Sequence, residues 1–148
     1  MDLALMGNLG RITHVGDIVE LCFPELGFLV TYFVACLIFE VEDDVFYVEF
    51  EDWFKPDGLR LHREVVAIEK IRPHPPHIQS SRFDGGDLAE VYFDGGWWLG
   101  RVLHVCAFPF YSYHVVLIDT FDEVVICELA QMRLHQVWEE ERWIIVID

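Results

Sequence analysis

Short runs of β-branched and aromatic residues dominate the chain, and turn residues rich in Asp, Gly and Pro separate them. Runs of this length and composition are typical of β-strands, whereas no stretch longer than about two turns combines a helical period with capping residues. Many short strands at close spacing predict an all-β barrel or sandwich. The runs that we predict as strands are 18–23, 45–50, 88–93, 98–105, 113–118 and 124–127.

One further apolar run, residues 26–39, carries no charged residue before its end. It is too short for a membrane helix, which needs about 20 apolar residues. Its content of β-branched and aromatic residues favours a buried strand.

The chain also repeats itself with an offset of 70 residues, because Gly16–Leu21 (GDIVEL) recurs as Gly86–Val91 (GDLAEV). In each copy an aromatic pair precedes a long strand, and an aliphatic–arginine pair stands near the end. These pairs are Tyr32-Phe33 and Ile71-Arg72 in the first copy, and Trp97-Trp98 and Met132-Arg133 in the second. A repeat of this kind predicts two copies of one structural unit.

Residues 72–81, between the two copies, contain three of the six prolines. A proline-rich segment of this length is a stiff, extended spacer. We therefore predict two small barrels, residues 14–76 and 83–148. Because a barrel of about 60 residues buries little surface by itself, we expect the two to pack together.

The charge balance narrows the choice of partners. Asp and Glu number 26 against 10 Lys and Arg, a formal net charge of −16. Such a surface repels phosphate backbones, so we expect no direct DNA binding, whereas a basic peptide would be attracted. The acidity can also serve solubility alone, and both interpretations stay open at this point.

Motifs that carry chemistry are absent from the sequence. The four cysteines form no CxxC pair and the seven histidines are scattered, so we predict no metal and no other cofactor. We find no Gly-rich phosphate loop, no Gly-x-Ser-x-Gly and no His-Glu-x-x-His, and therefore predict that the protein is not an enzyme. We also expect no signal peptide, no membrane association and free cysteines in a reducing compartment.

The order and spacing of the motifs resemble the tandem Agenet module of plant proteins, a Tudor-like module of the Royal superfamily. Four segments carry the resemblance: Gly16–Glu20, Gly27–Ala35, Asp94–Val102 and Met132–Trp143. The sequence departs from the family at Val30–Tyr32, where Gly-Ser-Trp is frequent, and at Leu134, where Pro is common. The resemblance implies two Tudor-like (SH3-like) small β-barrels in tandem, in a monomeric nuclear protein.

The resemblance also implies a chromatin reader that binds a methylated lysine of the basic histone H3 tail. Our best guess is the dimethyl-lysine mark of heterochromatin. Aromatic faces attract a methylated ammonium, each contact contributing about 0.5–2 kcal/mol, so such a site needs several converging rings. By analogy with Tudor domains the rings are Phe23, Tyr32 or Phe33, Phe50 and Trp53, with the carboxylates of Glu51 and Asp52 beside them.

Two alternatives stay open for these residues. A small barrel needs large side chains in its core, so any of the rings can be ordinary core. The module can also be a protein-interaction or RNA-associated Tudor-like domain without methyl-lysine recognition.

In the second copy Leu117 and Thr120 stand where the first has Phe50 and Trp53. We therefore predict that the second barrel completes the peptide groove and holds no methyl-lysine itself. His104 and His114 are candidates for that groove.

Overall fold

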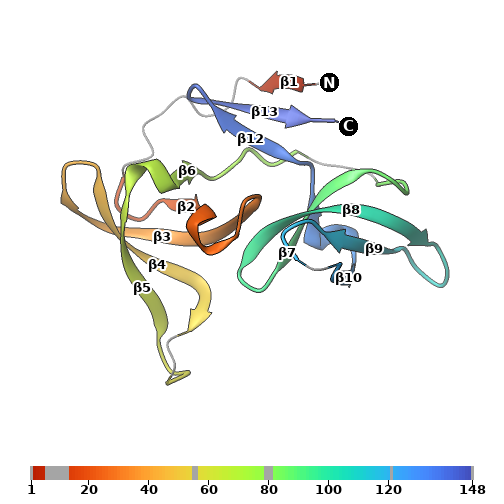
Figure 1. The fold of residues 1–148 in the computed structure, drawn as a ribbon, viewed down its shortest axis with the longest axis horizontal. Coiled ribbons are helices and arrows are strands. Elements are labelled where there is room, and N and C mark those ends of the chain that lie inside the picture. The colour runs from red at the N-terminus through yellow and green to blue at the C-terminus, as the bar shows by residue number, and fades with distance from the viewer. Residues whose placement is uncertain (1, 6–13, 55–56, 79–81, 121, 148) are drawn as a thin grey trace. The chain divides into compact units, whose positions relative to one another are not determined.

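The computed structural model describes residues 2–5, 14–54, 57–78, 82–120 and 122–147, and they form an all-β protein with three short 3-10 helices (Figure 1). The described residues divide into two compact units. The first holds residues 14–74 and 93–96, and the second holds residues 2–5, 75–92 and 97–147. No helix in this part of the chain is long and apolar enough to cross a membrane.

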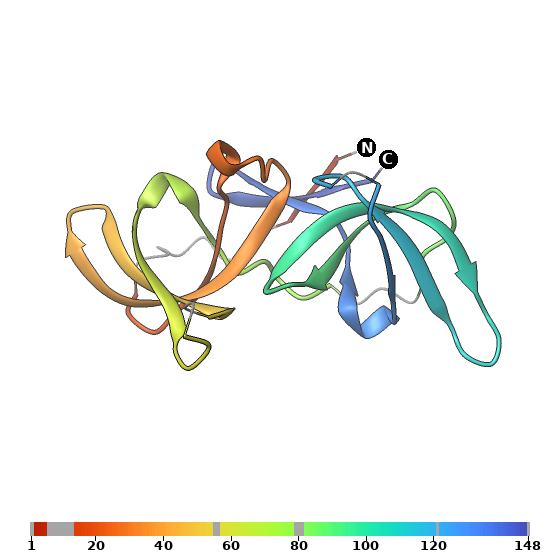
Figure 2. The ribbon, with the colours of Figure 1, turned by 60° about the horizontal axis from the view of Figure 1, so that its bottom comes forward.

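The first unit is an antiparallel sheet with the strand order β5–β4–β3–β2–β6. It curls into a small barrel, as does the sheet of the second unit (Figure 2). Its core residues alternate along the strands, as in Phe46, Val48 and Phe50. The elements are β2 (Ile18–Leu21), η1 (Pro24–Leu26), β3 (Thr31–Glu42), β4 (Val45–Phe54), β5 (Leu61–Ala67), η2 (Ile68–Lys70) and β6 (Ile71–Pro73).

The second unit repeats this pattern with the order β10–β9–β8–β7–β11. The same unit contains a separate three-stranded sheet, β1–β13–β12, in which Trp143 is completely buried. The elements are β7 (Leu88–Phe93), β8 (Gly96–Cys106), β9 (Ser112–Leu117), β10 (Val124–Cys127), η3 (Leu129–Gln131), β11 (Met132–Arg133), β12 (Gln136–Glu139), β13 (Arg142–Val146) and β1 (Asp2–Leu5).

All six predicted strands coincide with observed strands, but the interpretation of residues 26–39 as one buried strand is wrong. Leu26 ends η1 and is 62% exposed, Leu29 is 66% exposed, and β3 begins only at Thr31. Pro24 and Gly27 explain the difference, because proline favours the first turn of a helix and Gly27 adopts a left-handed conformation that ends it.

The repeated Gly-Asp pair makes the same turn in both units. Gly16 and Gly86 have φ values of 94° and 92°, a region that a side chain disfavours. Their backbone N–H groups donate to the carbonyls of Leu37 (2.8 Å) and Val102 (2.7 Å), which fastens each turn to the long strand of its unit. The glycine at the first position of the repeated motif therefore has a structural role, which is to form this turn.

The glutamate of the first motif is buried and forms an ion pair with an arginine far along the chain. Arg72 donates from Nη2 to Oε1 of Glu20 at 2.8 Å, and both side chains are at least 96% buried. The guanidinium also lies on the ring of Tyr32, with Cζ 3.3 Å from the ring centroid. Burial of these charges is tolerated because the pair is hydrogen-bonded and stacked.

The second unit repeats this arrangement. Glu90 accepts hydrogen bonds from Arg133 Nε (2.7 Å) and from the backbone N–H of Gln136 (3.1 Å), and it lies 2.8 Å from His135 Nδ1. Arg133 lies on the ring of Trp97, 4.1 Å from its centroid. The repeated Glu and Arg of the two sequence copies thus form one glutamate–arginine–aromatic stack in each unit.

Candidate functional site

Four aromatic rings of the first unit form a closed circuit. Phe23 follows β2, Phe33 lies on β3, and Phe50 and Trp53 lie on β4. Successive ring centroids are 6.2 Å apart for Phe23–Phe33, 5.5 Å for Phe33–Trp53, 4.9 Å for Trp53–Phe50 and 6.0 Å for Phe50–Phe23. We call these four residues the aromatic cluster.

Burial distinguishes one member of the cluster from the others. Phe23, Phe33 and Phe50 are between 1% and 7% exposed, whereas Trp53 is 40% exposed. The three phenyl rings therefore pack as core, and the indole covers them at the surface. Trp53 is the member that meets an approaching ligand first.

The backbone of β4 explains why Phe50 and Trp53 share the cluster. In a regular strand, residues three apart point to opposite faces. The pairing of β4 with β5 is irregular between Glu49 and Phe54, which breaks the alternation at this point. The i, i+3 pair predicted from the sequence thus does bring its two rings together.

Tyr32 and Phe33 make different contacts in the structure. The two are neighbours on β3, so their side chains point to opposite faces. Phe33 contacts the cluster, whereas Tyr32 stacks on Arg72 in the buried glutamate–arginine–aromatic stack. Which of the two serves in a binding site stays a prediction.

Two more rings pack against the cluster, and neither was predicted as a site residue. Phe28 meets Phe33 edge to face, with centroids 5.2 Å apart. The imidazole of His62 on β5 stacks on Phe50 at 5.4 Å and lies 5.3 Å from Trp53. His62 looked like one of several scattered histidines, and only the pairing of β4 with β5 places it beside the aromatic pair.

The carboxylates beside the cluster are available to a cation. Glu51 and Asp52 are exposed and make no hydrogen bond or ion pair within the described part of the chain. Glu25, in contrast, pairs with Lys70, and the hydrogen bond from that ammonium lowers the pKa of the Glu25 carboxyl. Lys70 Nζ also lies 5.4 Å from the centroid of Phe23.

Comparison with known proteins shows which proteins this chain is similar to. Residues 16–76 match the Agenet domain family. The Arabidopsis thaliana Protein AGENET DOMAIN (AGD)-CONTAINING P1 is 32% identical over 131 residues, which cover 88% of this chain and 25% of the relative. The chain thus spans about a quarter of the length of this relative.

Two solved structures are similar to this chain over most of its length. Arabidopsis thaliana AGDP1 AGD34 has a TM-score of 0.78 and 27% identity, covering 89% of this chain and 88% of that one. The ADCP1 tandem Agenet domain 3-4 has a TM-score of 0.74 and 25% identity, covering 89% and 86%. The predicted fold class, two Tudor-like small β-barrels in tandem, is confirmed. Agenet and Tudor-like domains are binding modules.

The second Agenet-like unit cannot build the same circuit from the equivalent positions. Leu117 is a buried aliphatic residue, and Thr120 accepts from the backbone N–H of Glu123 and donates to the carbonyl of Leu117. Neither residue offers a ring.

His104 and His114 form a stacked pair across β8 and β9, with centroids 4.1 Å apart. Their place in a peptide groove stays a prediction.

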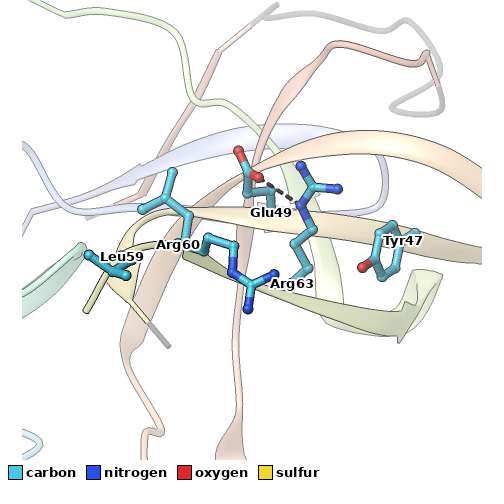
Figure 3. Close-up of a pocket in the computed structure, with 6 residues that line it drawn as sticks. Tyr47, Glu49, Leu59, Arg60 and Arg63 are labelled. Carbon is cyan, nitrogen blue, oxygen red and sulfur yellow. Dashed lines mark hydrogen bonds and ion pairs between the residues drawn. The ribbon is translucent and has the colours of Figure 1, made fainter. Parts of the chain in front are cut away.

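The outer face of the first unit has a second feature, an open hollow (Figure 3). Glu49 accepts a hydrogen bond from Arg63 Nε at 2.7 Å within it, and the guanidinium of Arg60 lies nearby. Arg63 is thus already neutralised by a carboxylate. The residues that line the hollow are Tyr47, Glu49, Leu59, Arg60, Leu61 and Arg63.

Proposed function

We propose that this chain is a nuclear chromatin reader that binds a methylated lysine of the histone H3 tail at the aromatic cluster. The second unit would complete the peptide groove. The observation that carries the proposal is the circuit of Phe23, Phe33, Phe50 and Trp53, with the unpaired carboxylates of Glu51 and Asp52 next to it.

The chemistry of a methylated ammonium suits this arrangement. Methyl groups remove hydrogen-bond donors and spread the positive charge over an apolar surface, so aromatic faces replace water as its neighbours. Rotation of the exposed Trp53 would open the packed rings to the cation. A dimethylammonium keeps one N–H that can donate to a carboxylate, whereas a trimethylammonium has none, and this favours the dimethyl over the trimethyl state.

The remainder of the chain supports a basic partner. The net charge of −16 attracts a Lys/Arg-rich tail, and salt limits this attraction to distances within the Debye length. Tandem Agenet structures resemble both units, and such modules bind peptides or proteins.

A second candidate is an interaction module for basic segments that does not sense methylation. The burial of Phe23, Phe33 and Phe50 favours it, because rings that are at most 7% exposed can serve as core alone. In that case Glu51 and Asp52 would hold an unmodified lysine or arginine, and Trp53 would contact only its side-chain stem.

One titration separates the two candidates. Isothermal calorimetry would compare an H3-tail peptide carrying dimethyl-lysine with its unmodified twin, using the wild type and Trp53→Ala. We expect the wild type to prefer the methylated peptide, and Trp53→Ala to weaken binding by about 1–3 kcal/mol, the scale of a lost aromatic anchor.

The matched control is Phe39→Ala. Phe39 is another exposed aromatic residue of the same unit, 48% exposed, and it packs on Tyr47 outside the cluster. Its loss should leave peptide affinity unchanged, with circular dichroism confirming the fold of both variants. Equal affinity for the two peptides, or wild-type binding by Trp53→Ala, would refute the methyl-lysine site.

A further inference from the structure

His62 packs against the aromatic cluster, at a position that no motif indicated. Its ring is inclined by only 27° to that of Phe50, with centroids 5.4 Å apart, and by 40° to that of Trp53, at 5.3 Å. The side chain is 33% exposed, so solvent protons reach it. A titratable ring therefore lies against the most exposed part of the proposed cation site.

We propose that His62 is a wall of the methylammonium site, and that its protonation closes this site to cationic ligands. The inference rests on the proposed function. The neutral imidazole adds an aromatic face beside Phe50 and Trp53. The imidazolium instead is a cation stacked on those two rings, where it competes with the ligand for them and repels it.

Carboxylates lie on the strand that carries His62 and on the strand that packs against it. On β5, Glu64 Oε1 lies 3.7 Å from His62 Nε2. On β4, the strand that packs against the ring, Glu51 and Asp52 lie between Phe50 and Trp53 in the sequence. The cation next along β5, Arg63, is held by Glu49, as Figure 3 shows.

Other cations in this region are also occupied. Arg60, across the loop before β5, has Asp57 Oδ2 3.4 Å from its Nη2. Both arginines are thus paired with carboxylates other than Glu64. Protonation of His62 would then place a cation within the site itself.

The experiment uses the full chain and an H3-tail peptide with dimethyl-lysine, titrated by calorimetry at constant ionic strength from about pH 7.5 to about pH 5.5, on either side of the usual titration of histidine. We expect wild-type affinity to fall about tenfold over this range, the scale of one added charge at this distance. His62→Phe keeps an aromatic ring at this position and cannot titrate, so whatever its affinity at pH 7.5, it should lose the pH dependence.

Two further variants keep the test decisive. His62→Gln lacks both the ring and the charge, so it should bind more weakly and show no pH dependence. It provides the test if the larger phenyl group of His62→Phe disturbs the barrel. His104→Phe, in the stacked pair of the second unit, should retain the wild-type pH profile. A pH-independent wild type, or an unchanged pH profile in His62→Phe or His62→Gln, would overturn the role of His62. Absence of methyl-dependent binding at pH 7.5 would instead overturn the proposed function, and the inference with it.

Discussion

The first unit contains two arginine–glutamate pairs of almost the same length that differ in burial. Arg72 Nη2 lies 2.8 Å from Glu20 Oε1, and their side chains are 4% and 0% exposed. Arg63 Nε lies 2.7 Å from Glu49 Oε2, and their side chains are 46% and 27% exposed. Replacing each arginine by methionine therefore tests whether burial, and not distance, sets the contribution of an ion pair.

The expected effects differ widely. Arg72→Met leaves the charge of Glu20 buried without its arginine, and removes the stack on Tyr32. Loss of one partner of a buried pair costs about 3–5 kcal/mol, a large part of the total stability of about 5–15 kcal/mol for a small domain. Arg63→Met should produce almost no measurable change, because water screens an exposed pair and replaces its bonds.

Urea unfolding provides the assay. Trp53 is the only tryptophan of the first unit, so ¹⁹F NMR of protein labelled with 5-fluorotryptophan follows this unit separately from the four tryptophans after it. Arg72→Met should lower the urea midpoint of the Trp53 signal strongly, and Arg63→Met should leave it in place.

A double variant tests the physical cause. Glu20→Gln combined with Arg72→Met removes both charges, so it should be more stable than Arg72→Met alone. Equal midpoints for Arg72→Met and Arg63→Met, or a double variant that recovers no stability, would show that the uncompensated buried charge is not the source of the loss.

Three further predictions concern the second unit and the peptide surface. Gly100→Ala should destabilise the protein by about 1–3 kcal/mol in thermal unfolding, since its Cβ would lie 2.5 Å from Val115 Cγ1, whereas Gly85→Ala should be tolerated because its nearest contact is 3.4 Å. Among the thiols, exposed Cys106 should react first with a disulfide reagent at neutral pH, and Cys127 only on unfolding, because burial raises the pKa of the Cys127 thiol to about 11. Affinity for the methylated peptide should fall as salt rises, and constant affinity would show that the acidic surface does not contact the peptide.

Local sequence patterns determined the fold class and part of the candidate site. Strand composition and turn residues act within a few positions, so the six predicted strands and the repeated Gly-Asp turn were accessible without coordinates. The spacing of Phe50 and Trp53 pointed to a shared surface for the same reason, since both lie at one irregular strand end. Strand β5 was missed because charged residues interrupt its apolar pattern, and the short strands β12 and β13 were missed as well.

Only the tertiary structure decided which side chains meet. Tyr32 and Phe33 are adjacent aromatic residues, so alternation along the strand predicts that they point to opposite faces. It does not predict which of them meets the other phenyl rings. In the structure Arg72 lies on Tyr32, and Phe33 contacts Phe23. The partnership of Glu20 with Arg72 joins residues 52 positions apart, and His62 reaches the cluster through pairing of neighbouring strands. Such contacts depend on register and chain closure, which are set by the packing of the whole barrel rather than by any local segment.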